Sequence, residues 1–115
     1  MGRMDVGIDL VAIERFRDAL AQKKDQFLHS TFSGIELEYC LSYSDPAPHL
    51  AGTFAAKEAV RKATGESGAF SDTEIRRSAG GKPEVWLRGV RAPSILLSIT
   101  HTETDACAVA IAQNI

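Results

Sequence analysis

Apolar residues alternate with other residues along several segments, beginning close to the start of the chain. Residues 6–11 place Val6, Ile8 and Leu10 on one face of an extended segment and Asp9 on the other. A period of two residues is typical of a β-strand. The same pattern predicts four later strands, whose short connections favour antiparallel pairing. They cover Thr73–Ser78, Pro83–Leu87, Ile95–Thr100 and Ala106–Ala112.

Apolar residues at helical spacing lie between the first two predicted strands. They predict helices over residues 13–23, 33–41 and 49–64. Ser33 and Glu36 have the spacing of a capping box, and Gly65 suits the left-handed residue that ends a helix. The longest helix gains a smooth face from Ala51, Ala55, Ala59 and Ala63. Without βαβ alternation, this order indicates an α+β fold: a small, mainly antiparallel sheet of about five strands, packed with one long helix and shorter helices.

The composition is that of an ordinary globular domain. The 115 residues are 44% hydrophobic and 24% charged, with a formal net charge of −2, which points to neither nucleic acid nor an anionic membrane. No apolar run reaches the length of a membrane span, and Met1–Asp5 is too short and polar to begin a signal peptide. Cys40 and Cys107 stand in unrelated contexts, as reduced thiols do. We therefore expect a cytoplasmic protein with one domain over residues 1–115.

Two carboxylates have positions that allow metal chemistry. Asp9 interrupts an otherwise apolar strand, where an unpaired buried charge is costly. Either its face is exposed, or it caps a backbone group, or it is an oxygen ligand for a divalent cation. Glu58 stands four residues before Lys62, an order that favours a solvated ion pair on a helix, and Lys57 and Arg61 extend the same polar surface. These residues alone leave the choice open.

Two later segments suit contact with an anion. Between residues 74 and 91 there are five basic residues and two acidic ones. Gly80–Pro83 is either a plain β-turn or bare glycine backbone and a lysine lying against a phosphate, although it lacks the spacing of a P-loop. His101 ends a predicted strand, where a structural role is equally consistent. Ser98 lacks the Gly-x-Ser-x-Gly surroundings of a serine hydrolase.

Taken in order, these segments resemble the motifs of the holo-acyl-carrier-protein synthases, the short class of 4′-phosphopantetheinyl transferases. The matching segments are Gly7–Val11, Ile13–Arg15, Leu50–Ala63, Gly81–Pro83 and Ser98–Thr102. The resemblance covers essentially the whole chain, and its most specific part is the Phe54–Ala59 block with its distance from Asp9. It implies an enzyme that transfers the 4′-phosphopantetheine of coenzyme A to a serine of an apo acyl carrier protein and releases adenosine 3′,5′-bisphosphate.

The resemblance also implies the site residues. Family members bind coenzyme A and a divalent cation in clefts between the subunits of a homotrimer, so Asp9 and Glu58 are the implied ligands of Mg²⁺ or Mn²⁺. The implied catalytic residues are Asp9, Glu58 and Lys62, with Lys62 acting as a cation on the phosphates. The general base stays open among Asp9, Glu58 and a metal-bound water. The implied coenzyme-binding residues are Lys57, Lys62, Gly81, Lys82, Pro83 and His101.

Two more expectations concern binding of the acyl carrier protein and binding of the 3′-phosphate of coenzyme A. Arg15 matches a basic family position on the first helix, and Arg17 adds charge that attracts an acidic carrier. Thr53 stands where the family usually has arginine, and the loop Ser44–His49 keeps only His49 as a basic group. Because those family residues bind the 3′-phosphate, we expect coenzyme binding to be weaker by roughly 1.5–3 kcal/mol. We also expect less discrimination against 3′-dephospho-coenzyme A.

Three other functions stay open at this point. A catalytically weak or inactive trimeric relative that binds coenzyme A or a carrier fits Thr53 and the acidic, proline-containing loop before it. Such a binder has no need of the full set Asp9, Lys57, Glu58, Lys62 and His101. A metal-dependent phosphohydrolase would use the carboxylates but consume coenzyme A without a carrier. A purely structural trimer would use neither. The carrier is equally open, since a carrier of fatty-acid synthesis, the default, and one of polyketide synthesis are chemically equivalent.

Overall fold

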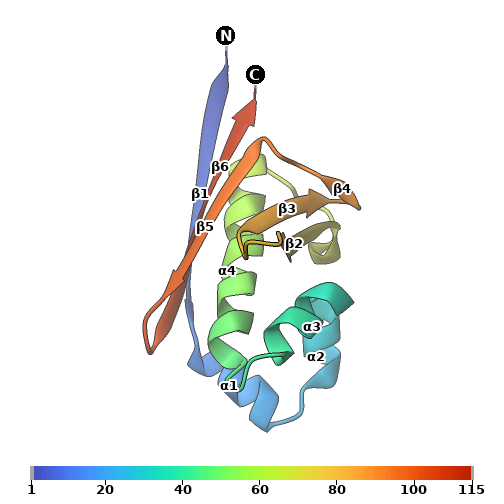
Figure 1. Cartoon of the computed structure of the whole chain (residues 1–115), viewed down its shortest axis with the longest axis vertical. Helices are drawn as coiled ribbons and strands as arrows, with labels where there is room; N and C mark the ends of the chain where they lie inside the picture. The colour runs from blue at the N-terminus through green and yellow to red at the C-terminus, as the bar shows by residue number, and fades with distance from the viewer. Residues whose placement is uncertain (1, 115) are drawn as a thin grey trace.

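The chain adopts an α+β fold in which one long helix lies between a three-stranded sheet and the remaining elements (Figure 1). The structure is a computed structural model that describes residues 2–114. In chain order its elements are β1 (Arg3–Ala12), α1 (Glu14–Ala21), α2 (Asp25–Thr31), α3 (Gly34–Leu41), α4 (Ala47–Thr64), the 3₁₀ turn η1 (Phe70–Asp72), β2 (Thr73–Arg77), β3 (Pro83–Leu87), β4 (Val90–Arg91), β5 (Ile95–His101) and β6 (Asp105–Asn114). The predicted fold class is confirmed.

The strands form two antiparallel sheets of three strands each, in the orders β1-β6-β5 and β2-β3-β4. The prediction of a single sheet of about five strands is wrong in this respect. One edge of β3 is bonded to β2 and the other to β4, where Trp86 lies opposite Arg91, so β3 has no edge left for β5. The two-residue strand β4 follows a turn in which Arg88 and Gly89 have φ values of 49° and 80°. Such left-handed pairs make tight hairpins.

Helix ends that have a capping signal in the sequence lie where that signal predicts. Ser33 Oγ accepts a hydrogen bond from the Glu36 amide at 3.2 Å, and a Glu36 carboxylate oxygen accepts one from the Ser33 amide at 2.9 Å. This is the predicted capping box of α3. α4 ends as predicted at Gly65, with a φ of 73°, and begins two residues early because Pro46 and Pro48 fit its first turn. The sequence does not predict α2, which has no side-chain cap.

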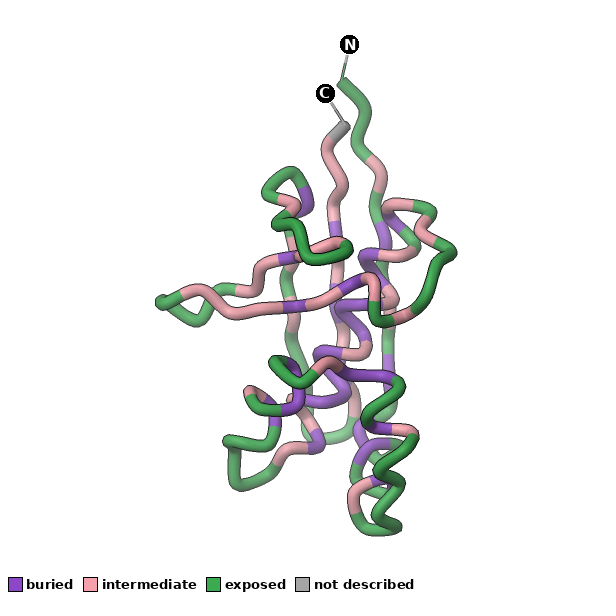
Figure 2. Tube along the Cα trace, turned by 90° about the vertical axis from the view of Figure 1, so that its right-hand side faces the viewer, coloured by how far each residue is buried: buried purple, intermediate pink, exposed green. Residues whose placement is uncertain are grey.

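Small side chains allow α4 to lie directly on the inner face of the β1-β6-β5 sheet. Its regularly spaced alanines are all buried, and Figure 2 shows buried residues gathered along the centre of the molecule. β6 contributes three more buried alanines, Ala106, Ala108 and Ala110. On β1 the contact needs a glycine, because a Cβ on Gly7 would lie 1.9 Å from the carbonyl oxygen of Ala59. Backbone therefore packs on backbone where β1 crosses α4.

The apolar row of β1 points away from this core. Its four members are between 60% and 69% exposed, whereas Gly7 and Val11 are buried beside α4 and Asp9 lies between them. The alternation therefore predicts the strand correctly, but the apolar side is the solvent side of the single chain. We call this row, together with Leu96, which lies on the same face of the sheet across β6, the outer sheet face. It consists of Met4, Val6, Ile8, Leu10 and Leu96.

Candidate functional site

Asp9 lies on the helix-facing side of β1, next to α4. Its side chain is 16% exposed, and its carboxylate accepts a hydrogen bond from Lys62 Nζ at 3.1 Å. The same ammonium donates to the carbonyl oxygen of Ile8 at 2.9 Å. The face of Asp9 is thus packed rather than exposed, and its charge is balanced by a lysine from a distant part of the chain. This pairing explains how a carboxylate is tolerated in an apolar strand.

Glu58 lies one turn before Lys62 on α4, and its side chain is 34% exposed. Within residues 2–114 its ion-pair partner is Arg61, whose Nε is 3.9 Å from Glu58 Oε1. Arg61 is itself held by two carbonyl oxygens of the loop that follows α4, at 3.0 and 3.4 Å. The helical pair of Glu58 with Lys62, which the spacing favours, is not the arrangement found. Lys62 reaches across to Asp9 instead, and leaves Glu58 loosely paired.

The oxygens around Lys62 suit a hard divalent cation. The positively charged ammonium of Lys62 already lies against two of them, Asp9 Oδ1 and the carbonyl oxygen of Ile8. Magnesium prefers such oxygens and is usually bound through one or two carboxylates, water and substrate phosphate. Residues 2–114 contain no cluster of three or more His, Cys, Asp or Glu side chains able to hold a metal. Asp9 and Glu58 supply carboxylate oxygens of the kind that magnesium prefers, and water and phosphate would have to complete its shell.

Lys57, the neighbour of Glu58, is completely buried. Its Nζ donates to Glu36 Oε1 at 2.8 Å and to the Thr31 carbonyl oxygen at 3.0 Å, and it lies 4.8 Å from the centre of the Phe70 ring. The other Glu36 oxygen accepts from the Ile75 amide at 2.8 Å. These bonds tie α2, α3, α4 and β2 together. Direct contact of Lys57 with coenzyme, as predicted, would require this network to open.

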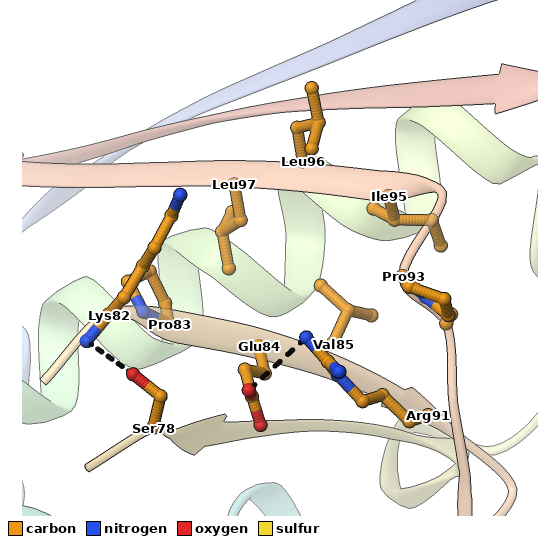
Figure 3. Close-up of a pocket in the computed structure, with 11 residues that line it drawn as sticks. Ser78, Lys82, Pro83, Glu84, Val85, Arg91, Pro93, Ile95, Leu96 and Leu97 are labelled. Carbon is orange, nitrogen blue, oxygen red and sulfur yellow. Dashed lines mark hydrogen bonds and ion pairs between the residues drawn. The ribbon is translucent and has the colours of Figure 1, made fainter. Parts of the chain in front are cut away.

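The predicted phosphate turn lies between β2 and β3. Gly81 has a φ of 85°, and Ser78 Oγ accepts from the Lys82 amide at 3.2 Å. Lys82 and Pro83 border a cavity of about 270 Å³ between β3 and β5. Figure 3 shows Lys82 extending toward β5, while Arg91 reaches Glu84 at the other end of the cavity, at 3.2 Å. The turn therefore places the Lys82 side chain at the edge of this cavity, next to the glycine backbone of the turn.

His101 borders a different cavity, of about 170 Å³. Its ring lies 6.2 Å from that of His49, which stacks on Tyr43 at 3.5 Å. Arg77 and Tyr39 also line this cavity, and the sequence did not single out either of them. Burial lowers the pKa of His49, and the neighbouring side chains of His101 and Arg77 lower it further. The excess of basic residues between 74 and 91 was the available signal for Arg77.

α4 separates the predicted residues into two groups. Glu58 and Lys62 lie on the flank beside β1, whereas His49 lies about 180° from Glu58 and about 140° from Lys62 around the helix axis, at about 100° per residue. That second flank faces β5, where a Cβ on Gly52 would lie 3.0 Å from Ile99 Cγ2. The carboxylate group and the histidine group are therefore not brought together within one chain.

The two predicted carrier-binding arginines lie on α1 in different surroundings. Arg15 lies over the Phe54 ring, 4.8 Å from its centre. Arg17 donates to both carboxylate oxygens of Asp45, at 2.8 and 3.4 Å. The hydrogen bond from Arg17 lowers the pKa of Asp45, and the guanidinium pKa is raised in return. The charge of Arg17 is therefore already paired within the chain.

Thr53, the departure from the family pattern, is buried. Its side chain is in contact with the Cys40 thiol, with Oγ1 and Sγ 3.5 Å apart. Burial raises the pKa of Cys40 to about 11. Position 53 therefore contributes neither charge nor an exposed hydroxyl to the surface.

Comparison with known proteins identifies the family. The family model described as "4′-phosphopantetheinyl transferase superfamily" matches residues 5–112. The holo-[acyl-carrier-protein] synthases of Chlorobaculum parvum and Chlorobium limicola are 37% and 40% identical to this chain. The matches cover 96% and 94% of this chain, and 98% and 92% of those proteins.

Solved structures agree with this result. The holo-(acyl-carrier-protein) synthase of Bacillus anthracis in complex with CoA (3′,5′-ADP) has a TM-score of 0.79 at 27% identity, covering 98% of this chain and 100% of that one. The Helicobacter pylori synthase in complex with coenzyme A has a TM-score of 0.77 at 30% identity, covering 91% and 96%. The resemblance seen in the motifs is confirmed, and the chain belongs to the 4′-phosphopantetheinyl transferase superfamily.

Proposed function

We propose that this protein transfers the 4′-phosphopantetheine of coenzyme A to a serine of an apo acyl carrier protein, as one domain over residues 1–115. The observation that carries the proposal is the half-buried Asp9 beside Lys62, with Glu58 one turn away. This group occurs in a chain whose relatives named holo-[acyl-carrier-protein] synthase match over nearly their whole length. The relative solved with CoA (3′,5′-ADP) holds the nucleotide that such a transfer releases.

The residues supply binding and charge compensation rather than covalent chemistry. The serine hydroxyl oxygen attacks the β-phosphorus of coenzyme A while the bond from that phosphorus to the bridging oxygen breaks. Adenosine 3′,5′-bisphosphate leaves in line, and the hydroxyl proton passes to Asp9, Glu58 or water. Lys62, which is 54% exposed, compensates negative charge on the phosphate oxygens. Asp9 and Glu58 would hold magnesium or manganese, which supplies positive charge and orients the phosphates when bound. Gly81, Lys82 and Pro83 bind the coenzyme from the rim of their cavity.

We propose that the protein is a homotrimer, assembled through the outer sheet face. A contiguous exposed apolar surface marks a protein interaction site, and this row is contiguous along one face of β1. The separation of Asp9 from His101 by α4 also favours a site shared between subunits, because one copy then supplies the carboxylates and another the histidine flank. Light scattering on the purified protein tests this, with a trimer expected for wild type and a smaller species for Ile8→Glu.

The proposed compartment is the cytoplasm and the proposed carrier that of fatty-acid synthesis. Cys40 and Cys107 are free thiols, which suits a reducing compartment. Over residues 2–114, no helix combines the length and the apolar character needed to cross a membrane.

One alternative has specific support. Thr53 is buried and uncharged, and Asp45 adds negative charge in the loop before α4. Both features favour a relative that binds coenzyme A or a carrier but transfers poorly.

Intact mass of an apo carrier protein, after incubation with this protein, coenzyme A and Mg²⁺, separates these functions. A transferase adds one phosphopantetheine, and the gain disappears with EDTA and in the Asp9→Ala and Glu58→Ala variants. A binder leaves fatty-acid and polyketide carriers unmodified although it binds coenzyme A. A phosphohydrolase consumes coenzyme A even when the carrier is left out. An incubation without the carrier therefore tests for phosphohydrolase activity.

A further inference from the structure

Lys62 occupies one of the two carboxylate oxygens that Asp9 could offer to a metal ion. Its ammonium contacts one carboxylate oxygen of Asp9 and the neighbouring Ile8 carbonyl, at 3.1 and 2.9 Å. An ammonium and a divalent cation cannot both sit against the same oxygens, because their charges repel strongly at such distances. One lysine is therefore placed to act either on the carboxylate or on a phosphate, but not on both.

We infer that Lys62 is a built-in counterion that suppresses metal binding at Asp9 until a phosphate-bearing substrate draws its ammonium away. The inference rests on the proposed function, since it takes Asp9 as a metal ligand and Lys62 as a phosphate-binding cation. Metal and coenzyme then bind cooperatively, because each favours the position of Lys62 that the other also requires. Coupling of this kind is reciprocal, so the factor by which coenzyme tightens metal binding equals the factor by which metal tightens coenzyme binding.

The two sides of the contact differ in freedom. The Asp9 side chain is 16% exposed and sits on a strand, whereas the Lys62 side chain is 54% exposed on the helix flank. Lys62 can therefore swing toward solvent, and Asp9 stays where it is. The other two cations of this part of α4 lack this freedom: Lys57 is fully buried, and Arg61 is 20% exposed and bound to loop carbonyls. Of these three residues, only Lys62 has a side chain free to leave Asp9 and contact a phosphate.

Titration of the full-length protein with Mn²⁺ in the absence of coenzyme, followed by electron paramagnetic resonance of the free ion, measures the suppression directly. Lys62→Gln keeps a polar side chain and removes the charge, so we expect Mn²⁺ to bind about tenfold more tightly, as removal of a charge a few ångströms from a dication predicts. Lys62→Arg keeps the charge and should bind as wild type does. Lys24→Ala removes the same charge from the exposed segment between α1 and α2, and is the matched control.

Repeating the titration with saturating coenzyme A measures the coupling. Wild type should gain Mn²⁺ affinity when coenzyme is added, and Lys62→Gln should gain much less. Asp9→Asn in the Lys62→Gln background should lose the tight site, which shows that Asp9 is the ligand. Thermal melts of every variant check that the fold is intact.

Equal or weaker Mn²⁺ binding by Lys62→Gln, or undiminished coupling in that variant, overturns the inference. Carrier modification by wild type is scored separately. A protein that modifies the carrier but shows no effect of Lys62 on Mn²⁺ refutes the counterion alone. One that shows the Lys62 effect but modifies no carrier refutes the transferase alone.

Discussion

The buried network around Glu36 offers a stability test that also decides what Lys57 does. Glu36 accepts hydrogen bonds from Lys57 Nζ and from the amides of Ser33 and Ile75, and Lys57 donates in addition to Thr31. Both side chains of the ion pair are 0% exposed. Replacing Glu36 by Gln leaves an ammonium buried without its counterion, and replacing Lys57 by Met leaves the carboxylate in the same state.

The expected cost of either single change follows from burial. Removing one partner of a buried ion pair costs about 3–5 kcal/mol, because the remaining charge is neither solvated nor paired. For a domain of this size, that loss lowers the melting temperature by about 12–20 °C, at roughly 4 °C per kcal/mol. The double variant Glu36→Gln/Lys57→Met carries no buried charge, so it should be more stable than either single variant.

Urea unfolding of the four proteins at 25 °C gives the coupling free energy directly. Asp5→Ala is the control, since it breaks an ion pair with Arg3 whose side chains are 42% and 75% exposed, and such surface pairs contribute little. Coenzyme binding by the folded double variant, measured by calorimetry, then separates two roles for Lys57. Unchanged affinity indicates a structural lysine, and about a tenfold loss in an intact fold indicates the coenzyme contact that the family resemblance implies.

Two results would refute the stability argument. One is a loss of under 1 kcal/mol in each single variant, and the other is a double variant as unstable as the sum of its parts. Either result would mean that the pair is solvated in the protein.

Three further predictions concern single positions. Gly7→Ala should destabilise the fold by at least about 1–3 kcal/mol, measured by urea unfolding, because its methyl group would meet the Ala59 carbonyl; a neutral change would contradict the close contact. Asp45→Asn should lower the KM for the carrier about two- to fivefold with kcat unchanged, because it frees Arg17. As the control, adding Asp45→Asn to an Arg17→Ala variant should leave the KM for the carrier unchanged. With Thr53 buried and uncharged, the ratio of kcat/KM for coenzyme A to that for 3′-dephospho-coenzyme A should stay below about tenfold in wild type; a stronger preference for coenzyme A would contradict this.

Elements with their own end signals could be predicted from sequence. α3 carries a capping box and α4 ends at a left-handed glycine, and both lie where those signals place them. α2 has no cap, and its helix depends on packing of Phe27 and Phe32 around Phe16, at ring distances of 6.1 and 5.8 Å. Such contacts between segments are not visible as local periodicity. The division into two sheets was missed for a similar reason, since it depends on the pairing of β4 with β3.

The candidate site shows the same limit at the level of charge pairs. Local spacing pairs Lys62 with Glu58 on one helix face, but the structure pairs it with Asp9, 53 residues away. Lys57 looks like part of the same polar face until Glu36, 21 residues away, is found beside it. Residue type and the family resemblance are the basis on which Asp9, Glu58 and Lys62 are proposed as site residues. Which charges neutralise one another depends on the tertiary fold.

The position of Gly7 connects the two faces of β1. A strand presents successive side chains to opposite faces, so a slip of one residue would exchange Asp9 for Ile8 or Leu10 on the side of Lys62. Such a slip would also bring the side chain of Val6 or Ile8 against the Ala59 carbonyl, where not even a methyl group fits. Gly7 therefore holds the register that places Asp9 against Lys62, and the same register turns Val6, Ile8 and Leu10 outward. The carboxylate proposed to bind metal and the apolar face proposed for assembly thus depend on one glycine.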